Sequence, residues 1–240
     1  MIDFKKKYIK TIRLNSYRPL CSTAIGLRAI EKYSFPPFID ASCRREPDFQ
    51  NPNPSITALC RQGLFAPNLY PNDVVIYMTV RGRWYRTFDH HRLIAILSVI
   101  DRKESHYEAK LKYLVGGLPI PSNCMVDGNN PYDFDKTAGK FVKTLDINRF
   151  LSFPPEKQKI IGERTVKLWD EEYWRKSKEN GVFIITKPIF LELYDPPILT
   201  DQILTDVFGK VPNTRNPNLI KERSKFKELA RLAGINYIDT

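Results

Sequence analysis

The residues with the clearest chemical potential lie in the stretch FIDASCRREP, residues 38–47, which holds Arg44, Arg45 and Glu46 in succession. The planar guanidinium group of arginine matches phosphate oxygens and base edges with two hydrogen bonds at once. Neighbouring arginines in an extended loop point in different directions. One could therefore hold a carboxylate such as Glu46 or Asp48 while the other meets a phosphate. This predicts an anion-accepting rim, and a salt-bridge network that pins the loop is the alternative.

A second candidate is the stretch RGRWYR, residues 81–86, in which arginines alternate with Trp84 and Tyr85. Rings stack on bases and guanidinium groups follow phosphates, so this pattern suits single-stranded or flipped bases. The alternative is a tip that folds back with its tryptophan buried. The predicted nucleic-acid contacts are Arg44, Arg45, Glu46, Arg61, Tyr77, Arg83, Trp84, Tyr85, Arg92 and His106.

Carboxylates raise the alternative of a metal-dependent nuclease centre, which needs several acidic oxygens close together. The motif in which an Asp is followed by Glu-x-Lys, which is typical of such nucleases, is absent from the sequence. A zinc site is a further alternative, but the four candidate ligands have no standard spacing. We therefore assign no catalytic residue, no metal and no cofactor. The acidic candidates are Asp40, Glu46 and Asp48, then Asp133 and Asp135; the zinc candidates are Cys43, Cys60, Cys124 and His106.

The overall charge favours a polyanionic partner. The 240 residues include 38 Lys and Arg against 27 Asp and Glu, for a net charge of +11, and nucleic acid is the commonest polyanion. With 42% apolar residues the chain can bury a core. It has no long apolar run, and no apolar segment follows its basic start, so we expect no membrane span, no signal peptide and a cytoplasmic location.

The elements that must position these residues follow from periodicity and from turn residues. We expect an α+β body in which residues 1–150 form one domain and a mainly helical extension, residues 151–240, completes it. The C-terminal helix carries basic residues on a face that is either solvated or follows phosphates. The expected strands are 8–20, 74–80, 92–100 and a pair within 182–194 bent at Pro188, and the expected helices are 22–33, 55–63, 104–115, 154–181 and 216–233.

The order of several short sequence motifs resembles that of a known group of families. CRREPDF, SITALCR and FAP are followed by a turn that ends in Asp73, by the strands VVIYMT and RLIAILSVI, and by SHYEA. This order, within residues 8–144, resembles the nucleotide-modification-associated domain families and, more distantly, the PUA-like barrels of the ASCH, EVE and YTH groups. The chain lacks the Gly-x-Lys-x-x-Glu-x-Arg run of the ASCH group.

The resemblance implies a PUA-like, strongly bent β-barrel with helices at its mouth. Relatives bind nucleic acid, several read a modified or flipped base in a pocket, and some are enzymes. We therefore predict a nucleic-acid-binding module, for DNA or RNA, that recognises modified or flipped bases. The first alternative is an enzyme that acts on nucleic acid or nucleotides, either a metal-dependent nuclease or a base-processing hydrolase, in phage defence. The second is a protein-interaction subunit with an acidic partner.

Overall fold

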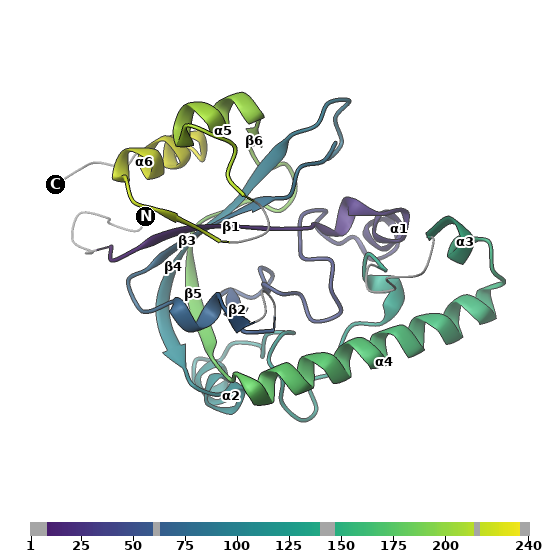
Figure 1. Cartoon of the computed structure of the whole chain (residues 1–240). Helices are drawn as coiled ribbons and strands as arrows, with labels where there is room; N and C mark the ends of the chain where they lie inside the picture. Colours follow the sequence, from purple (N-terminus) through teal and green to yellow (C-terminus); the bar gives the residue numbers. More distant parts are fainter. Residues whose placement is uncertain (1–8, 60–62, 140–146, 214–216, 236–240) are drawn as a thin grey trace.

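A strongly curled, open sheet forms the centre of the computed structural model, which describes residues 9–59, 63–139, 147–213 and 217–235 (Figure 1). The sheet is mixed, because β1 and β3 run parallel while the other pairs are antiparallel. Its order is β2-β5-β4-β3-β1-β7, with β6 paired to β4. The strands are β1 Ile12–Tyr17, β2 Ser55–Thr57, β3 Val74–Thr79, β4 His91–Lys103, β5 Phe183–Leu191, β6 Ile198–Leu199 and β7 Asn218–Ile220.

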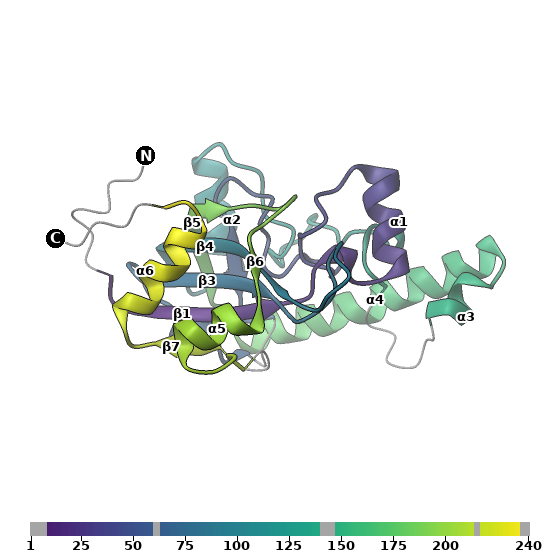
Figure 2. The ribbon, with the colours of Figure 1, turned by 90° about the horizontal axis from the view of Figure 1, so that it is seen from above.

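Helices cover the two faces of this half-barrel unequally. α5 and α6 lie together against one face, and the long α4 runs beneath the other (Figures 1 and 2). The chain is therefore an α+β protein with a curled mixed half-barrel sheet. The helices are α1 Ala24–Tyr33, α2 His106–Val115, α3 Ile147–Leu151, α4 Pro155–Glu179, α5 Asp201–Phe208 and α6 Arg223–Leu232.

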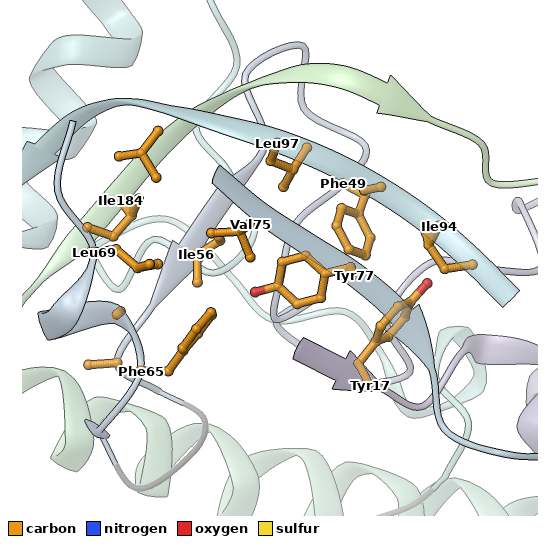
Figure 3. Close-up of a cluster of buried hydrophobic side chains, with 14 of the residues drawn as sticks. Tyr17, Phe49, Ile56, Phe65, Leu69, Val75, Tyr77, Ile94, Leu97 and Ile184 are labelled. Atoms are coloured by element: carbon orange, nitrogen blue, oxygen red, sulfur yellow. The ribbon is translucent and has the colours of Figure 1, made fainter. Parts of the chain in front are cut away.

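The alternation of side chains along β3 divides the core between the two faces. Val74, Ile76 and Met78 pack in the cluster that contains the apolar residues of α5 and α6. Val75 and Tyr77 belong to a second cluster on the concave face, which also holds Tyr17, Phe65 and Leu97 (Figure 3). The concave face is thus the aromatic one.

Several predicted elements are confirmed. The helix expected at 22–33 is α1, whose cap is Thr23: its hydroxyl accepts from the Gly26 N–H at 3.1 Å. Pro155 stands in the first turn of α4, as expected for the charged helix at 154–181. The strands predicted at 74–80 and 92–100 are β3 and β4, and the helix predicted at 104–115 is α2.

Other predictions are wrong. The helix expected at 55–63 begins instead as β2, because Ser55, Ile56 and Thr57 pair with β5. The strand pair expected at 182–194 is one strand, β5, with Pro188 opposite Leu97 at a register shift. The start of the helix expected at 216–233 lies outside the described residues, and α6 begins only at Arg223, after β7.

The described C-terminal part is mainly helical, through α4, α5 and α6, but it also completes the sheet. Residues 151–240 supply β5, which lies between β2 and β4 inside the sheet, as well as β6 and β7. The half-barrel therefore needs strands from both of the expected parts of the chain.

No helix within the described ranges combines the length and apolar character that crossing a bilayer requires.

Candidate functional site

A cavity of about 730 Å³ opens on the concave face of the half-barrel. Strands β1, β2 and β3 supply one wall, and α4 supplies the opposite wall with Trp169 and Tyr173. The loop that contains Asp40 and Glu46 closes one side, and the β3–β4 hairpin, with Trp84, borders another. The cavity thus brings together four segments that lie far apart in the sequence.

Several aromatic residues are among those that line this cavity. Tyr77 on β3 has its ring centroid 6.1 Å from that of Tyr17 and 6.5 Å from that of Phe65, both edge to face. Across the cavity, the rings of Trp169 and Tyr173 stack with centroids 6.1 Å apart. The Tyr17 hydroxyl donates to the Phe38 carbonyl, which fixes its ring. These buried rings pack mainly against one another and give the cavity an apolar, rigid wall.

Two carboxyl groups lie among these rings, from Asp40, which is 8% exposed, and Glu46, which is 5% exposed. Asp40 Oδ1 accepts the backbone N–H groups of Ser42 at 2.8 Å and of Glu46 at 3.0 Å. The loop therefore wraps around the Asp40 carboxylate. Glu46 accepts from the Thr57 N–H at 2.8 Å, from the Thr57 hydroxyl at 2.6 Å and from the Asn123 amide at 2.8 Å. These bonds fasten the loop to β2.

Burial perturbs both carboxyl groups in the same direction. Desolvation raises the pKa of Glu46 to about 8, although hydrogen bonds from Thr57 and Asn123 oppose the shift, and the neighbouring Asp40 adds to it. Desolvation also raises the pKa of Asp40, against the hydrogen bonds it accepts and the charge of Arg45. Strongly perturbed carboxyl groups in a concave site are typical of functional centres.

Positive charge lies at the opening of the cavity. Arg18, which follows β1, and Arg81, in the hairpin, line the cavity and are exposed. Arg81 also pairs with Asp201, with Nη2 3.1 Å from the carboxylate oxygen.

The Trp84 indole N–H donates to the Val80 carbonyl at 3.0 Å, and a Cβ at Gly82 would lie 2.4 Å from the Trp84 ring. A glycine at position 82 therefore lets the tryptophan fold against the hairpin.

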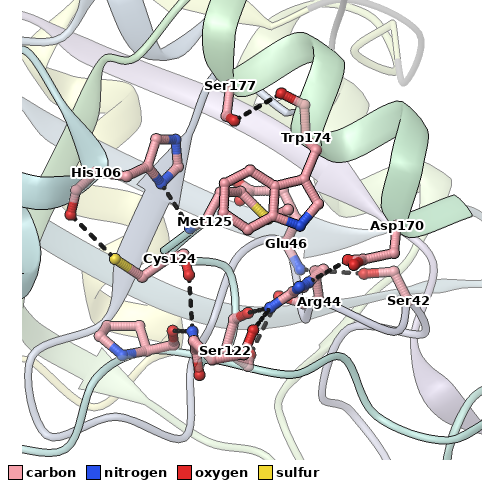
Figure 4. A network of polar contacts seen from close by, with 12 residues as sticks. Ser42, Arg44, Glu46, His106, Ser122, Cys124, Met125, Asp170, Trp174 and Ser177 are labelled. Carbon is pink, nitrogen blue, oxygen red and sulfur yellow. Dashed lines mark hydrogen bonds and ion pairs between the residues drawn. The ribbon is translucent and has the colours of Figure 1, made fainter. Parts of the chain in front are cut away.

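The paired arginines do not form the expected rim, because both are buried. Arg44 Nε donates to Asp170 on α4 at 2.6 Å, and its Nη1 donates to the carbonyls of Asn129 at 2.6 Å and Ser122 at 3.3 Å (Figure 4). Figure 4 shows Arg44 enclosed between α4 and the chain at Ser122. For Arg44, the structure therefore supports the alternative of a salt-bridge network that pins the loop.

Arg45 points away from Arg44 and clamps another part of the chain. Its guanidinium donates to the carbonyls of Asp40 at 2.7 Å and Lys136 at 2.5 Å. Its guanidinium carbon also lies 4.7 Å from the Tyr132 ring centroid. The two arginines hold the cavity loop from two sides, and they do not face a ligand.

The structure separates the remaining predicted contacts. Tyr77, Trp84 and Glu46 line the cavity. Arg92 is buried and donates to Asp195 at 3.0 Å and to the Pro196 carbonyl at 2.6 Å, so it fastens the loop after β5.

The other predicted contacts lie elsewhere. The side chains of Arg83 and Tyr85 are 77% and 53% exposed, on the hairpin. His106 is buried in α2, where its Nδ1 accepts from the Met125 N–H at 3.0 Å, and burial lowers its pKa to about 4. Arg61 lies outside the described residues.

Sequence reasoning missed several cavity residues. Trp169 and Tyr173 were read only as part of a charged helix, although they continue the buried stripe of Gly162 and Val166 at helical spacing. Arg81 belonged to the quoted RGRWYR stretch but was not nominated. Arg18 carries no local signal.

Within the described ranges, no group of three or more His, Cys, Asp or Glu side chains is arranged to hold a metal ion. Cys43 and Cys124 are buried free thiols, and Cys60 lies outside those ranges. Asp133 pairs with Lys136 at 2.7 Å.

Comparisons of the chain with protein-family models, with curated proteins and with solved structures found no match. The candidate site therefore rests on its own geometry.

Proposed function

We propose that this chain is a nucleic-acid-binding module that holds a modified or extruded base in the concave cavity. The observation that carries the proposal is the cavity itself, with rings on its walls, carboxyl groups inside and arginines at its opening. Its volume of about 730 Å³ lies within the range of about 300–1,000 Å³ that is usual for sites that enclose a small molecule.

The physics of base recognition matches this arrangement. A base leaves a duplex or a single strand at a cost of a few kcal/mol, and stacking on side-chain rings offsets that cost. Trp84, which is half-buried and lines the cavity, offers such a face. The sugar–phosphate backbone remains outside, where Arg18 and Arg81 can contact phosphates. The net charge of +11 adds a long-range attraction to any polyanion.

A PUA-like architecture is part of the proposal. The strongly curled sheet and the cavity on its concave face support it, as does the order of sequence words within residues 8–144. The open edges at β2 and β7 make the sheet a half-barrel and not a closed one. We propose that the chain shares with PUA-like domains the strongly bent sheet and the position of the ligand site on its concave face.

Fluorescence anisotropy with labelled single-stranded DNA and RNA, and with duplexes that contain one mispaired base, tests the proposal. We expect binding, with a preference for the strands and duplexes in which a base is free. Arg18→Ala and Arg81→Ala should each weaken binding and lower the slope of log K against log salt by about 0.7–0.9. Arg83→Ala, an exposed arginine outside the cavity, is the matched control. Equal losses in all three variants, or no binding at low salt, would contradict the proposal.

An enzyme that processes bases is the second candidate, and one observation favours it. Glu46 holds its proton near neutral pH inside the cavity, close to a second carboxyl group, as a general acid requires. Incubation with nucleosides and oligonucleotides, with and without Mg²⁺ or Mn²⁺, followed by chromatography of released bases and fragments, tests it. Product release that Glu46→Gln abolishes would favour the enzyme over the binding module.

A further inference from the structure

We infer that the cavity selects a base that carries an exocyclic amino group and rejects its carbonyl counterpart, with Asp40 as the residue that determines this specificity. The inference rests on the proposed function, since it names the chemistry of the base that the same cavity would hold. Four features of the site lead to it: the direction of its charge, the remaining acceptor position of Asp40, the fixed partners of Glu46 and the orientation of a bound nucleotide.

The cavity is polarised from its opening to its interior. The cationic side chains that line it, Arg18 and Arg81, are exposed, whereas Asp40 and Glu46 are buried. A nucleotide carries its negative charge on phosphate and its hydrogen-bond donors on the base. It therefore fits the cavity with phosphate at the opening and the base inside, and this orientation brings the base edge to the buried carboxyl groups.

Both oxygens of Glu46 are already bound to other elements of the fold. Of the about four acceptor positions of a carboxylate, three are taken: Oε1 accepts the Thr57 N–H, and Oε2 accepts the Thr57 hydroxyl and the Asn123 amide. These partners come from β2 and from the long loop that follows α2. Glu46 therefore locks the loop, and the Asn123 amide that it holds in place is not turned toward a ligand.

Asp40 keeps the acceptor capacity that a base edge could use. Asp40 also accepts three hydrogen bonds, but they include none from β2 or from the loop after α2: the backbone N–H groups of Ser42 and Glu46 both reach Oδ1, and the Ser42 side chain supplies the third. About one acceptor position remains, and Oδ2 receives neither of the two backbone N–H groups. Because Asp40 is 8% exposed, a ligand group beside it is removed from water and must supply its own complement.

An amino group supplies that complement, and a carbonyl does not. Cytosine presents N4–H₂ where uracil presents O4, and adenine presents N6–H₂ where hypoxanthine presents O6. Carboxylates accept from such amino groups, and a matched contact of this kind discriminates by about 1–3 kcal/mol, which corresponds to about 5- to 150-fold in affinity. A carbonyl beside the ionised Asp40 sets two acceptors against each other and leaves both without a donor.

Quenching of tryptophan fluorescence by nucleoside monophosphates tests the inference, since Trp84 and Trp169 line the cavity. The probes are two matched pairs, CMP with UMP and AMP with IMP. We expect at least fivefold tighter binding of the amino-bearing member in one or both pairs. Equal affinity within both pairs, or tighter binding of UMP and IMP, would overturn the inference and leave the proposed function standing. The absence of quenching by all four nucleotides would contradict both.

Asp40→Asn assigns the preference to this residue. The asparagine keeps an oxygen for the Ser42 and Glu46 N–H groups but offers the ligand a donor as well. The ratio of affinities within each discriminating pair should therefore fall to about twofold or less. Asp48→Asn is the matched control, because Asp48 is also buried and accepts the Ser122 N–H at 2.7 Å outside the cavity. Its ratios should equal those of the wild type, and an unchanged ratio in Asp40→Asn would remove Asp40 from the account.

Discussion

Replacement of Arg44 by alanine tests whether the arginine pair supports the fold or binds a ligand. Arg44 is 1% exposed, and its partner Asp170 on α4 is 17% exposed. The change leaves the Asp170 carboxylate and two carbonyl groups without this donor in a largely buried region. Loss of one member of a buried ion pair costs about 3–5 kcal/mol, whereas loss of a surface pair costs about 0–1 kcal/mol.

Urea denaturation followed by tryptophan fluorescence measures this cost. For a denaturant dependence of about 3 kcal/mol per M, the midpoint should fall by about 1–1.7 M in Arg44→Ala. Arg175→Ala removes an exposed arginine of α4 that pairs with Glu172 and should leave the midpoint nearly unchanged. Arg44→Lys keeps the charge without the planar fork and should lie between the two. A normal midpoint in Arg44→Ala, together with a tenfold loss of oligonucleotide affinity, would refute the structural role.

Two further predictions concern the loop carboxyl group and the start of α1. The pKa of Glu46 is raised to about 8 in the folded state, so its contribution to stability is present below its unfolded pKa and is lost as pH rises through 8. Wild type should thus lose up to about 1.4 kcal/mol per pH unit relative to Glu46→Gln between pH 5 and 8 in urea titrations, and parallel curves would contradict this. Gly26→Ala places a Cβ 1.8 Å from the Leu20 carbonyl oxygen and should lower the thermal midpoint by several degrees, whereas Gly116→Ala, with 3.4 Å clearance, should change it little. Equal midpoints in the two variants would show that α1 does not pack as described.

Local patterns were sufficient where the determinants lie close together in sequence. The strand β3 and the helix α1 depend on neighbours within a few residues, and both elements were predicted. Ser55–Thr57 was read as the start of a helix because Ser55 and Gly63 suit the two ends of a short helix, and only pairing with β5, more than a hundred residues later, makes it a strand. Local periodicity could not show that pairing.

The candidate site illustrates the same limit. The partner of Arg44 lies 126 residues away, and that of Arg92 lies 103 residues away, so composition alone could not show that these cations are already satisfied. Tyr77 and Trp84 were nominated for their chemistry, and both line the cavity. The buried aromatic stripe of α4 was readable from its spacing, but its position opposite Tyr77 depends on the packing of α4 beneath the sheet.

The central claim is that a base enters the concave cavity, and the three tryptophans of the chain test it directly. Trp84 and Trp169 line the cavity, whereas Trp174 is not among its lining residues and packs against the core cluster to which Trp169 belongs. Each is replaced singly by phenylalanine, and quenching by AMP and CMP is measured after correction for absorption. The account predicts reduced quenching in Trp84→Phe and Trp169→Phe and unchanged quenching in Trp174→Phe. Quenching that survives in both cavity variants and disappears in Trp174→Phe would place the ligand elsewhere.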